Sequence, residues 1–337
     1  MVTTTLPPPP RKTANPAPVR TANSVRRTSS IDVSWPDGVD GDRLFIGRVR
    51  DLRTPAGGGS GEVCGEAWME AMLREDKSIA SIKAKPEPDN LQNLVNERAG
   101  GHLRVVLRDA LPELLERGDP LYLVLDDLSG TALVSAFAWS QWLPDWTEHI
   151  RKTMSDEEFS NLMQQRVNVC WGLQEGNSGV SASGPNRSVA DADAGELRNP
   201  QDREGWHDFP ENEGPGFRRA RRIDVSRDPA DGLIRVDSAF QDSAKRKDGG
   251  RIAIHEYNLR VTVDPDTLEI LELQPEARIL PFSECPGAIH NTQRLVGSSI
   301  ADIRYEVLAN LRGPEGCTHL NDALRALAEV PRLVGYL

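Results

Sequence analysis

The sequence contains no run of about 18 to 20 apolar residues, the length that a helix needs to cross a bilayer. Its beginning, Met1 to Arg27, holds four consecutive prolines and several basic residues, but no apolar stretch of the kind found in secretory signals. Without such a signal, four cysteines in 337 residues do not make a disulfide framework. We therefore expect a cytoplasmic protein that has reduced thiols and does not contact a membrane.

Basic residues are also too few for a general nucleic-acid-binding protein. The formal net charge is −11 and the pI is near 5.2, so most of the surface would repel a phosphate backbone. The glycine-rich phosphate loop, the dinucleotide fingerprint and the Gly-x-Ser-x-Gly turn are absent as well. We expect no nucleic-acid partner and no nucleotide-dependent chemistry.

Two stretches far apart in the chain share one pattern. Residues 26–34 and 218–226 both read Arg-Arg-x-x-x-Ile-Asp-Val-Ser. Further segments recur in the same order, two of them strand-like and two helix-like: 43–54 with 233–243, 78–86 with 267–275, 103–107 with 303–308, and 125–127 with 320–322. The expected fold class is therefore α+β, with two tandem repeats that each contain several antiparallel strands followed by two helices.

This pattern divides the chain into four parts. Residues 1–24 are expected to be a disordered tail, and residues 25–150 the first α+β repeat, with a degenerate site. Residues 151–216 contain a short helix, which Ser155 and Glu158 begin with a capping box, and a flexible linker rich in Gly, Ser, Asn and Pro. Residues 217–337 form the second repeat, which carries the site.

Three tryptophans, Trp139, Trp142 and Trp146, precede the short helix. They either pack the end of the first repeat against the second or line a pocket for an aromatic ligand, and packing is the commoner role of large aromatic residues.

The second half is longer than the first at one point. Pro86 and Leu94 are eight positions apart, whereas their counterparts Pro275 and Leu295 are twenty apart. The additional residues include Glu284, Cys285 and His290. A Cys and a His in an insertion that only one half possesses indicate a site in that half.

A second Cys and His occur at the predicted start of a helix. Cys317 and His319 follow a Gly-Pro-Glu-Gly turn, and leucines at helical spacing come after them. The unpaired N–H groups and the dipole of a helix N-terminus favour a thiolate over a thiol at Cys317. The first half has Tyr122 and Val124 at the equivalent positions.

His255 and Glu256 lie in a predicted strand, where side chains alternate between faces. Strict alternation places on one face Ala253, His255 and Tyr257, and on the other Ile254, Glu256 and Asn258.

Thiolates and imidazoles together make a chemically reasonable tetrahedral zinc or iron site. The predicted metal ligands are His255, Cys285, Cys317 and His319. The predicted catalytic residues are Glu256, Glu284 and His290, with either Glu256 or Glu284 as the proton carrier.

The remaining candidates have simpler explanations. Cys64 and Cys170 are expected to be small buried hydrophobic residues, and His102, His149 and His207 have no comparable setting. The arginines at 26, 27, 218, 219, 221 and 222 either bind an anionic substrate through bidentate forks or serve the structural role that their position at strand starts favours.

Several motifs together resemble a bacterial family catalogued as domain of unknown function 2889. The residues that carry the resemblance are Arg222-Ile223-Asp224-Val225, Asp231-Gly232, His255-Glu256-Tyr257, Leu280-Pro281-Phe282, Glu284-Cys285-Pro286, Leu295-Val296-Gly297 and Gly316-Cys317-Thr318-His319-Leu320-Asn321-Asp322, with Arg50–Thr54 and Leu125–Leu128 in the first half. The resemblance supports the repeat and the choice of residues, and it implies no activity.

We expect a metal-dependent enzyme, of the hydrolase or lyase type, that acts on a small organic molecule. Two alternatives stay open. One is a metal-free enzyme that uses Cys317 as nucleophile or His319 as base, and the other is a non-enzymatic binding or assembly module with a structural metal. A homodimer is compatible with each of them.

Overall fold

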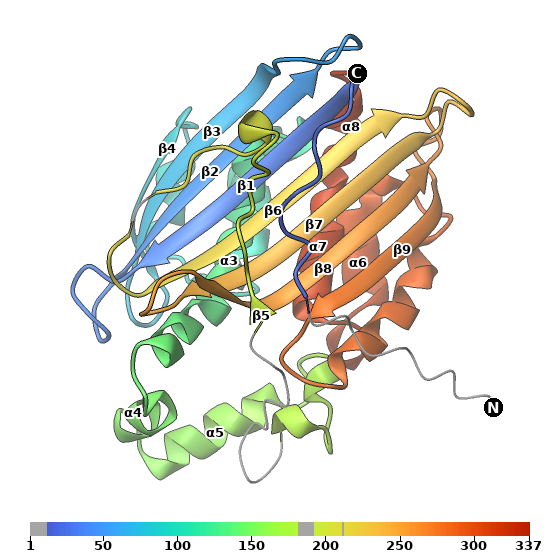
Figure 1. Ribbon diagram of the computed structural model, residues 1–337. Coiled ribbons are helices and arrows are strands. Elements are labelled where there is room, and N and C mark those ends of the chain that lie inside the picture. The colour runs from blue at the N-terminus through green and yellow to red at the C-terminus, as the bar shows by residue number, and fades with distance from the viewer. Residues whose placement is uncertain (1–11, 181–191, 211) are drawn as a thin grey trace, which may run out of the picture.

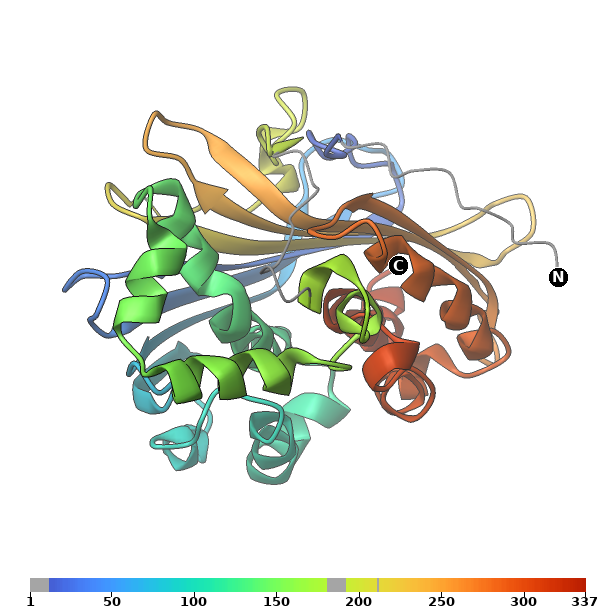
Figure 2. The same ribbon diagram turned by 90° about the horizontal axis from the view of Figure 1, so that it is seen from below.

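The computed structural model describes residues 12–180, 192–210 and 212–337. Within them a nine-stranded antiparallel sheet carries the helices on one face (Figures 1 and 2). The strands are β1 (Ser24–Ser34), β2 (Arg43–Thr54), β3 (Glu62–Leu73), β4 (Ile79–Lys85), β5 (Ala192–Asp193), β6 (Gly216–Arg227), β7 (Ile234–Lys245), β8 (Arg251–Val263) and β9 (Ile270–Ile279). The α+β class that the sequence predicts is confirmed.

The strand order is β4-β3-β2-β1-β6-β7-β8, and both β9 and the short β5 pair with the far side of β8. Each group of four long strands is a meander, and the two meanders meet where β1 pairs antiparallel with β6. Ile31 lies opposite Arg219 in that pairing, and Arg27 lies opposite Ile223. Side chains of a strand alternate between faces, so these four residues all point toward the helices.

The helices behind β1 to β4 belong to the first half of the chain. They are η1 (Leu91–Leu94), α1 (Leu103–Ala110), α2 (Pro112–Glu116), α3 (Pro120–Val134) and η2 (Ser135–Gln141), where η denotes a 3-10 helix. Those behind β6 to β9 are η6 (Cys285–Leu295), η7 (Ile300–Asp302), α6 (Ile303–Asn310), η8 (Gly313–Glu315), α7 (Thr318–Arg325), η9 (Ala326–Glu329) and α8 (Val330–Val334). Between the halves, α4 (Trp146–Lys152) and α5 (Asp156–Arg166) project beyond the sheet (Figure 1).

Helix α3 and η2 together form an apolar helical stretch, Pro120–Gln141, that is long enough to cross a membrane; in the described residues it alone meets this criterion. The expectation that no stretch is long and apolar enough is therefore wrong. However, 78% of its most apolar window is buried inside the protein. Burial against the sheet and neighbouring helices accounts for the apolar composition of α3, because thirteen of its fifteen residues are buried, among them the two aspartates Asp126 and Asp127.

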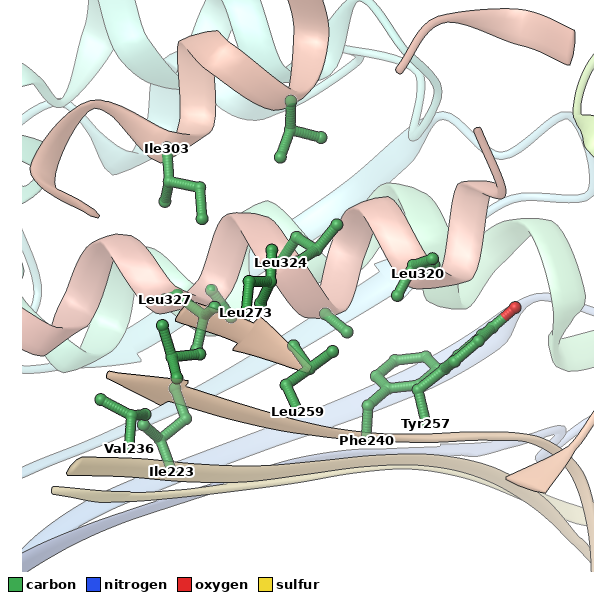
Figure 3. Packing of buried hydrophobic residues seen from close by; sticks show 14 of the residues in the cluster. Ile223, Val236, Phe240, Tyr257, Leu259, Leu273, Ile303, Leu320, Leu324 and Leu327 are labelled. Carbon is green, nitrogen blue, oxygen red and sulfur yellow. The ribbon is translucent and has the colours of Figure 1, made fainter. Parts of the chain in front are cut away.

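Two hydrophobic cores lie between the sheet and the helices, one in each half. In the second half, Leu320, Leu324 and Leu327 of the last helices face the strands, as their spacing predicts. Figure 3 shows them above Leu259 and Tyr257 of β8.

Buried charges separate the two cores. In the described part of the chain, ion pairs join six arginines and six acidic residues into one continuous network. Its members are Arg27, Arg104, Arg219, Arg221, Arg304 and Arg325 with Asp51, Asp126, Asp127, Asp242, Asp322 and Glu329. Buried charges are tolerated only when they are paired. The equal numbers of arginines and acidic residues leave this layer without net charge.

Residues 12–23 and 192–210 cross the face of the sheet opposite the helices (Figures 1 and 2). The backbone N–H of Ala17 donates to the carbonyl of Leu197 at 3.0 Å, and Arg20 pairs with Asp202 at 2.9 Å. These residues belong to the predicted tail and linker, and the structure gives them defined contacts. Residues 1–11, 181–191 and 211, which belong to the same two predictions, lie outside the described residues.

Two smaller predictions concern the region between the halves. Ser155 and Glu158 do form the capping box of α5. Trp142 donates its indole N–H to the carbonyl of Lys245 at 2.9 Å, which joins the end of the first half to β7.

Candidate functional site

A bulge in β8 determines where His255 points. Asp242 of β7 lies opposite His255, but the next residue, Ser243, lies opposite Ala253, so Ile254 has no partner in the ladder. Such an extra residue re-aims the side chains around it. Ile254 packs in the first-half core on the helix side, whereas Ala253 packs on the outer face. Strict alternation is therefore wrong for these two residues.

His255 faces the helices beside Asp242. Both oxygens of Asp242 accept N–H groups of Arg219 at 2.9 Å, and its Oδ2 lies 3.2 Å from His255 Nδ1. Burial would raise the pKa of Asp242, but the charge of Arg219 and the hydrogen bond from His255 outweigh it, so the pKa lies below its usual range. The ionised carboxylate then accepts a hydrogen bond, which places a proton on His255 Nδ1.

His319 stands at the start of α7, and its ring lies on that of His255. The ring centroids are 3.4 Å apart and the planes differ by 16°. Burial lowers the pKa of His319 well below its ordinary value, and the neighbouring His255 lowers it further. His319 is therefore neutral at pH 7. Its Nε2 lies 3.9 Å from Asp242 Oδ2, which is too long for a hydrogen bond.

Asp242, His255 and His319 form a cluster in which one potential ligand atom from each residue lies within 4.8 Å of the others. We call these three residues the His-Asp cluster. Within the described residues it is the one group of three such side chains that meets this distance criterion. Carboxylate and imidazole ligands in this combination suit zinc and non-haem iron.

The cysteines lie next to this cluster without joining it. The hydroxyl of Tyr257, two residues after His255, donates to Cys317 Sγ at 3.3 Å. Figure 3 shows Tyr257 and Phe240 rising from the strands toward α7. Burial raises the pKa of Cys317, although N–H groups at the helix start lower it. The prediction of a thiolate at Cys317 is therefore wrong, because desolvation outweighs the helix N-terminus.

The other predicted residues occupy different surroundings. Cys285 is buried at the start of η6, with its sulfur packed against the backbone of Gly172. Glu284 accepts hydrogen bonds from Ser178, and His290 is exposed on η6. The predicted metal set thus separates into two histidines that lie together and two cysteines that lie farther along the same face.

Glu256 does not share a site with His255. Its carboxylate accepts from the backbone N–H of Ala14 and from the side chain of Gln241, on the outer face of the sheet. Neighbouring residues of a strand point to opposite faces, so the sheet separates Glu256 from His319. The expectation that Glu256 carries protons at the His255 site does not agree with this arrangement.

Sequence reasoning missed Asp242, and it named Arg219 only as one of several arginines without connecting it to this site. A signal existed, because both occupy helix-facing positions in strongly predicted strands, and a charge at such a position must have a partner. Recognising the pair would have required the register between β6 and β7, which places Arg219 opposite Asp242.

Comparison with known proteins identifies one family. Residues 217–332 match the family model described as Protein of unknown function (DUF2889), a range that includes the whole His-Asp cluster. The motifs at 50–54 and 125–128 lie outside that range. No curated protein and no solved structure shows a match to the chain. The part of the chain that contains the cluster and the helices covering it is therefore similar to the DUF2889 family.

Proposed function

We propose that the protein is a metal-dependent enzyme, with zinc or iron, whose reacting centre is the His-Asp cluster. The observation that carries the proposal is the buried grouping of Asp242, His255 and His319, in which one potential ligand atom of each residue lies within 4.8 Å of the others. His255 and His319 would hold the ion through ring nitrogens. Asp242 would either be the third ligand or orient His255, a role that carboxylates commonly play for metal-bound histidines.

The protonation states support this assignment. A metal needs neutral imidazoles and an ionised carboxylate, and the surroundings favour those forms of His319 and Asp242. The side chain of His319 keeps 13% of its surface exposed, so the centre can be reached from outside. Arg219 holds both oxygens of Asp242, which favours the orienting role over direct ligation.

A bound zinc or iron ion would polarise a carbonyl group or activate water. Hydrolysis or a lyase-type cleavage of a small organic molecule follows from that chemistry. The chain's own contribution is to hold His255 in one orientation through Asp242 and to shield the centre with Phe240, whose ring centroid lies 6.5 Å from that of His319.

We also infer that the two halves arose by duplication and that the first lost its site. Arg27 and Asp51 form a buried bidentate pair like that of Arg219 and Asp242. The ladder of β2 and β3 even has a bulge at the matching place, where Cys64 is the extra residue. Gly65 lies opposite Asp51, where the second half has His255. This supports the inference that the first half kept the Arg-Asp pair and lost the histidine.

Elemental analysis tests the metal centre. We expect about one equivalent of zinc or iron in protein purified without chelator or nickel resin. His255→Ala and His319→Ala should each lose it. The exposed His290→Ala should retain it and serves as the matched control. Circular dichroism of each variant must show a native spectrum for the comparison to count.

Cobalt substitution distinguishes this centre from the set predicted from sequence. Coordination by histidine and carboxylate gives weak visible bands only, whereas a thiolate ligand adds an intense charge-transfer band in the near ultraviolet. We expect no such band, and we expect Cys317→Ser to bind cobalt as the wild type does. Folded protein that binds neither zinc, iron nor cobalt would refute the metal centre.

The hydrogen bond between His255 and Asp242 favours a second candidate, a metal-free enzyme in which His255 is the general base. A buried aspartate that orients a histidine and stabilises its protonated form is a known device of such enzymes. Asp242→Asn would then abolish activity in protein that contains no metal in any preparation.

A further inference from the structure

A cavity of about 340 Å³ opens on the outer face of the sheet, away from the helices. Arg218 of β6, Lys245 of β7 and Arg251 of β8 contribute basic groups to its wall, and Asp32 of β1 contributes an acidic one. The residues next to these in sequence, among them Arg219, point to the helix side. The cavity and the His-Asp cluster therefore lie across the sheet from each other.

Arg251 is the unusual member of this wall. It is half-buried, and its Nε and Nη2 donate to the hydroxyl and the carbonyl of Ser243, each at 2.9 Å. Among the described residues no carboxylate lies within ion-pair distance of it. Burial and the neighbouring charge of Arg218 together lower the pKa of Arg251 to about 9, although Asp32 and Glu196 act in the opposite direction. A desolvated cation without an anion is costly.

The other charged groups of the cavity wall form no ion pair with Arg251. Asp32 is already paired with Arg218 through a contact of 2.6 Å, and Arg218 stacks on the ring of Phe209. Lys245 donates to the backbone carbonyl of Asn212, a neutral group. Asp32 and the exposed Glu196 act on Arg251 only at longer range. Arg251 and Lys245 thus give the cavity two positive charges that form no direct ion pair with a described carboxylate, in a protein whose net charge is −11.

The rest of the wall is apolar. Leu44 and Ile46 of β2 lie on the outer face of the sheet and line the cavity together with Pro210. The volume falls in the range of small-ligand pockets, about 300 to 1,000 Å³. The guanidinium of Arg251 still has N–H groups to donate. A carboxylate presents two acceptor oxygens in one plane, which is the geometry that a planar guanidinium binds best.

We propose that this cavity binds a small organic acid, whose carboxylate pairs with Arg251 and Lys245 while its apolar body lies against Leu44 and Ile46. This site is independent of the proposed metal centre, because it uses other side chains on the other face of the sheet. It would remain if no metal were found at the His-Asp cluster.

Binding is measured by calorimetry and by thermal unfolding of the full chain, with benzoate, hexanoate and succinate as probes. Benzamide is the neutral counterpart of benzoate, and inorganic phosphate is an anion without an apolar body. We expect at least one carboxylate to bind with saturation and to raise the unfolding temperature, and we expect benzamide and phosphate to do neither.

Arg251→Met provides the decisive variant. It should weaken carboxylate binding at least tenfold, yet in the absence of ligand it should unfold at a higher temperature than the wild type, because a charge without a partner is removed. Arg246→Met removes the same charge from the adjacent turn, where Arg246 pairs with Asp248, and should change neither property.

Three results would overturn the proposal. One is the failure of all three carboxylates to bind the folded wild type. Another is equal carboxylate binding by the wild type and Arg251→Met. The third is binding of phosphate or benzamide as tight as that of benzoate.

Discussion

The carboxyl group of Glu256 is 2% exposed, and burial raises its pKa from 4.5 to about 7. The folded state therefore holds this proton more tightly than the unfolded chain does, and stability falls as the pH rises from about 5 to above 7. The loss from this group is at most about 3 kcal/mol. In Glu256→Gln, the urea-derived free energy of unfolding should decrease less between pH 5 and pH 8 than in the wild type.

The exposed Glu272→Gln is the control for this measurement and should follow the wild type at both pH values. A wild-type stability that rises from pH 5 to pH 8 by the same amount in all three proteins would contradict the raised pKa of Glu256.

Burial also governs how fast the cysteine thiols react. Cys170, Cys285 and Cys317 are each no more than 9% exposed, whereas Cys64 is half-buried. Because a thiol must be reached and ionised to react, we expect a disulfide reagent at pH 8 to label one cysteine of the native protein quickly and all four after unfolding. Cys64→Ser should remove the fast reaction. Rapid labelling of Cys317 would show that the helix N-terminus prevails over desolvation after all.

Single residues show why the site could be predicted only in part. His255 and His319 were identifiable because imidazoles in otherwise apolar patterns are conspicuous. Asp242 was not, because it becomes meaningful only opposite His255 and Arg219, and such pairing depends on strand register. The cysteines attracted attention through their type, but the pKa of Cys317 depends on burial, which sequence neighbours do not reveal.

Among the elements, α3 has a glycine where helices usually prefer alanine. A Cβ at Gly130 would lie 2.1 Å from Arg219 Nη1 and 2.4 Å from Asp322 Oδ2. Alanine would therefore displace the ion pair that these two residues form.

Gly130→Ala should consequently destabilise the protein by about 3 kcal/mol or more, the scale of a broken buried ion pair. An ordinary glycine to alanine change within a helix instead stabilises by about 1 kcal/mol. Urea unfolding measures the difference, and Gly101→Ala, where a Cβ would meet nothing within 4 Å, is the control. A Gly130→Ala protein as stable as the wild type would mean that the network rearranges at no cost.

At the scale of the whole molecule, the sequence predicted the order of strands and helices well. The strand predicted at 43–54 coincides with β2, and the one at 267–275 overlaps β9. It could not predict that β1 and β6 join the halves into one continuous sheet, because hydrophobic alternation indicates a strand but not its partner. The ionic layer could not be predicted either. Some of its pairs join neighbouring strands and depend on their register, and others join residues that are 103 or 302 positions apart in the chain.

That layer should make the two halves unfold as one unit. Asp126 of α3, in the first half, accepts from Arg304 and Arg325 of the second half at 2.8 and 2.7 Å. Removing one partner of such a buried pair lowers the free energy of unfolding by about 3 to 5 kcal/mol. Asp126→Asn should therefore destabilise both halves to the same extent. Asp109→Asn, which alters an exposed pair with Arg108, should cost no more than about 1 kcal/mol.

The placement of tryptophan makes cooperative unfolding measurable. Five of the seven tryptophans belong to the first half, whereas Trp171 packs against the second-half core. Fluorescence therefore reports mainly on the first half, and circular dichroism reports on the entire chain. Coincident transitions are the mark of a single cooperative unit. We expect the two signals to share one urea midpoint in the wild type, and we expect Asp126→Asn to shift both by the same amount. If the fluorescence midpoint moved while the dichroism curve split into two steps, each half would fold by itself, and the buried charges would not couple them.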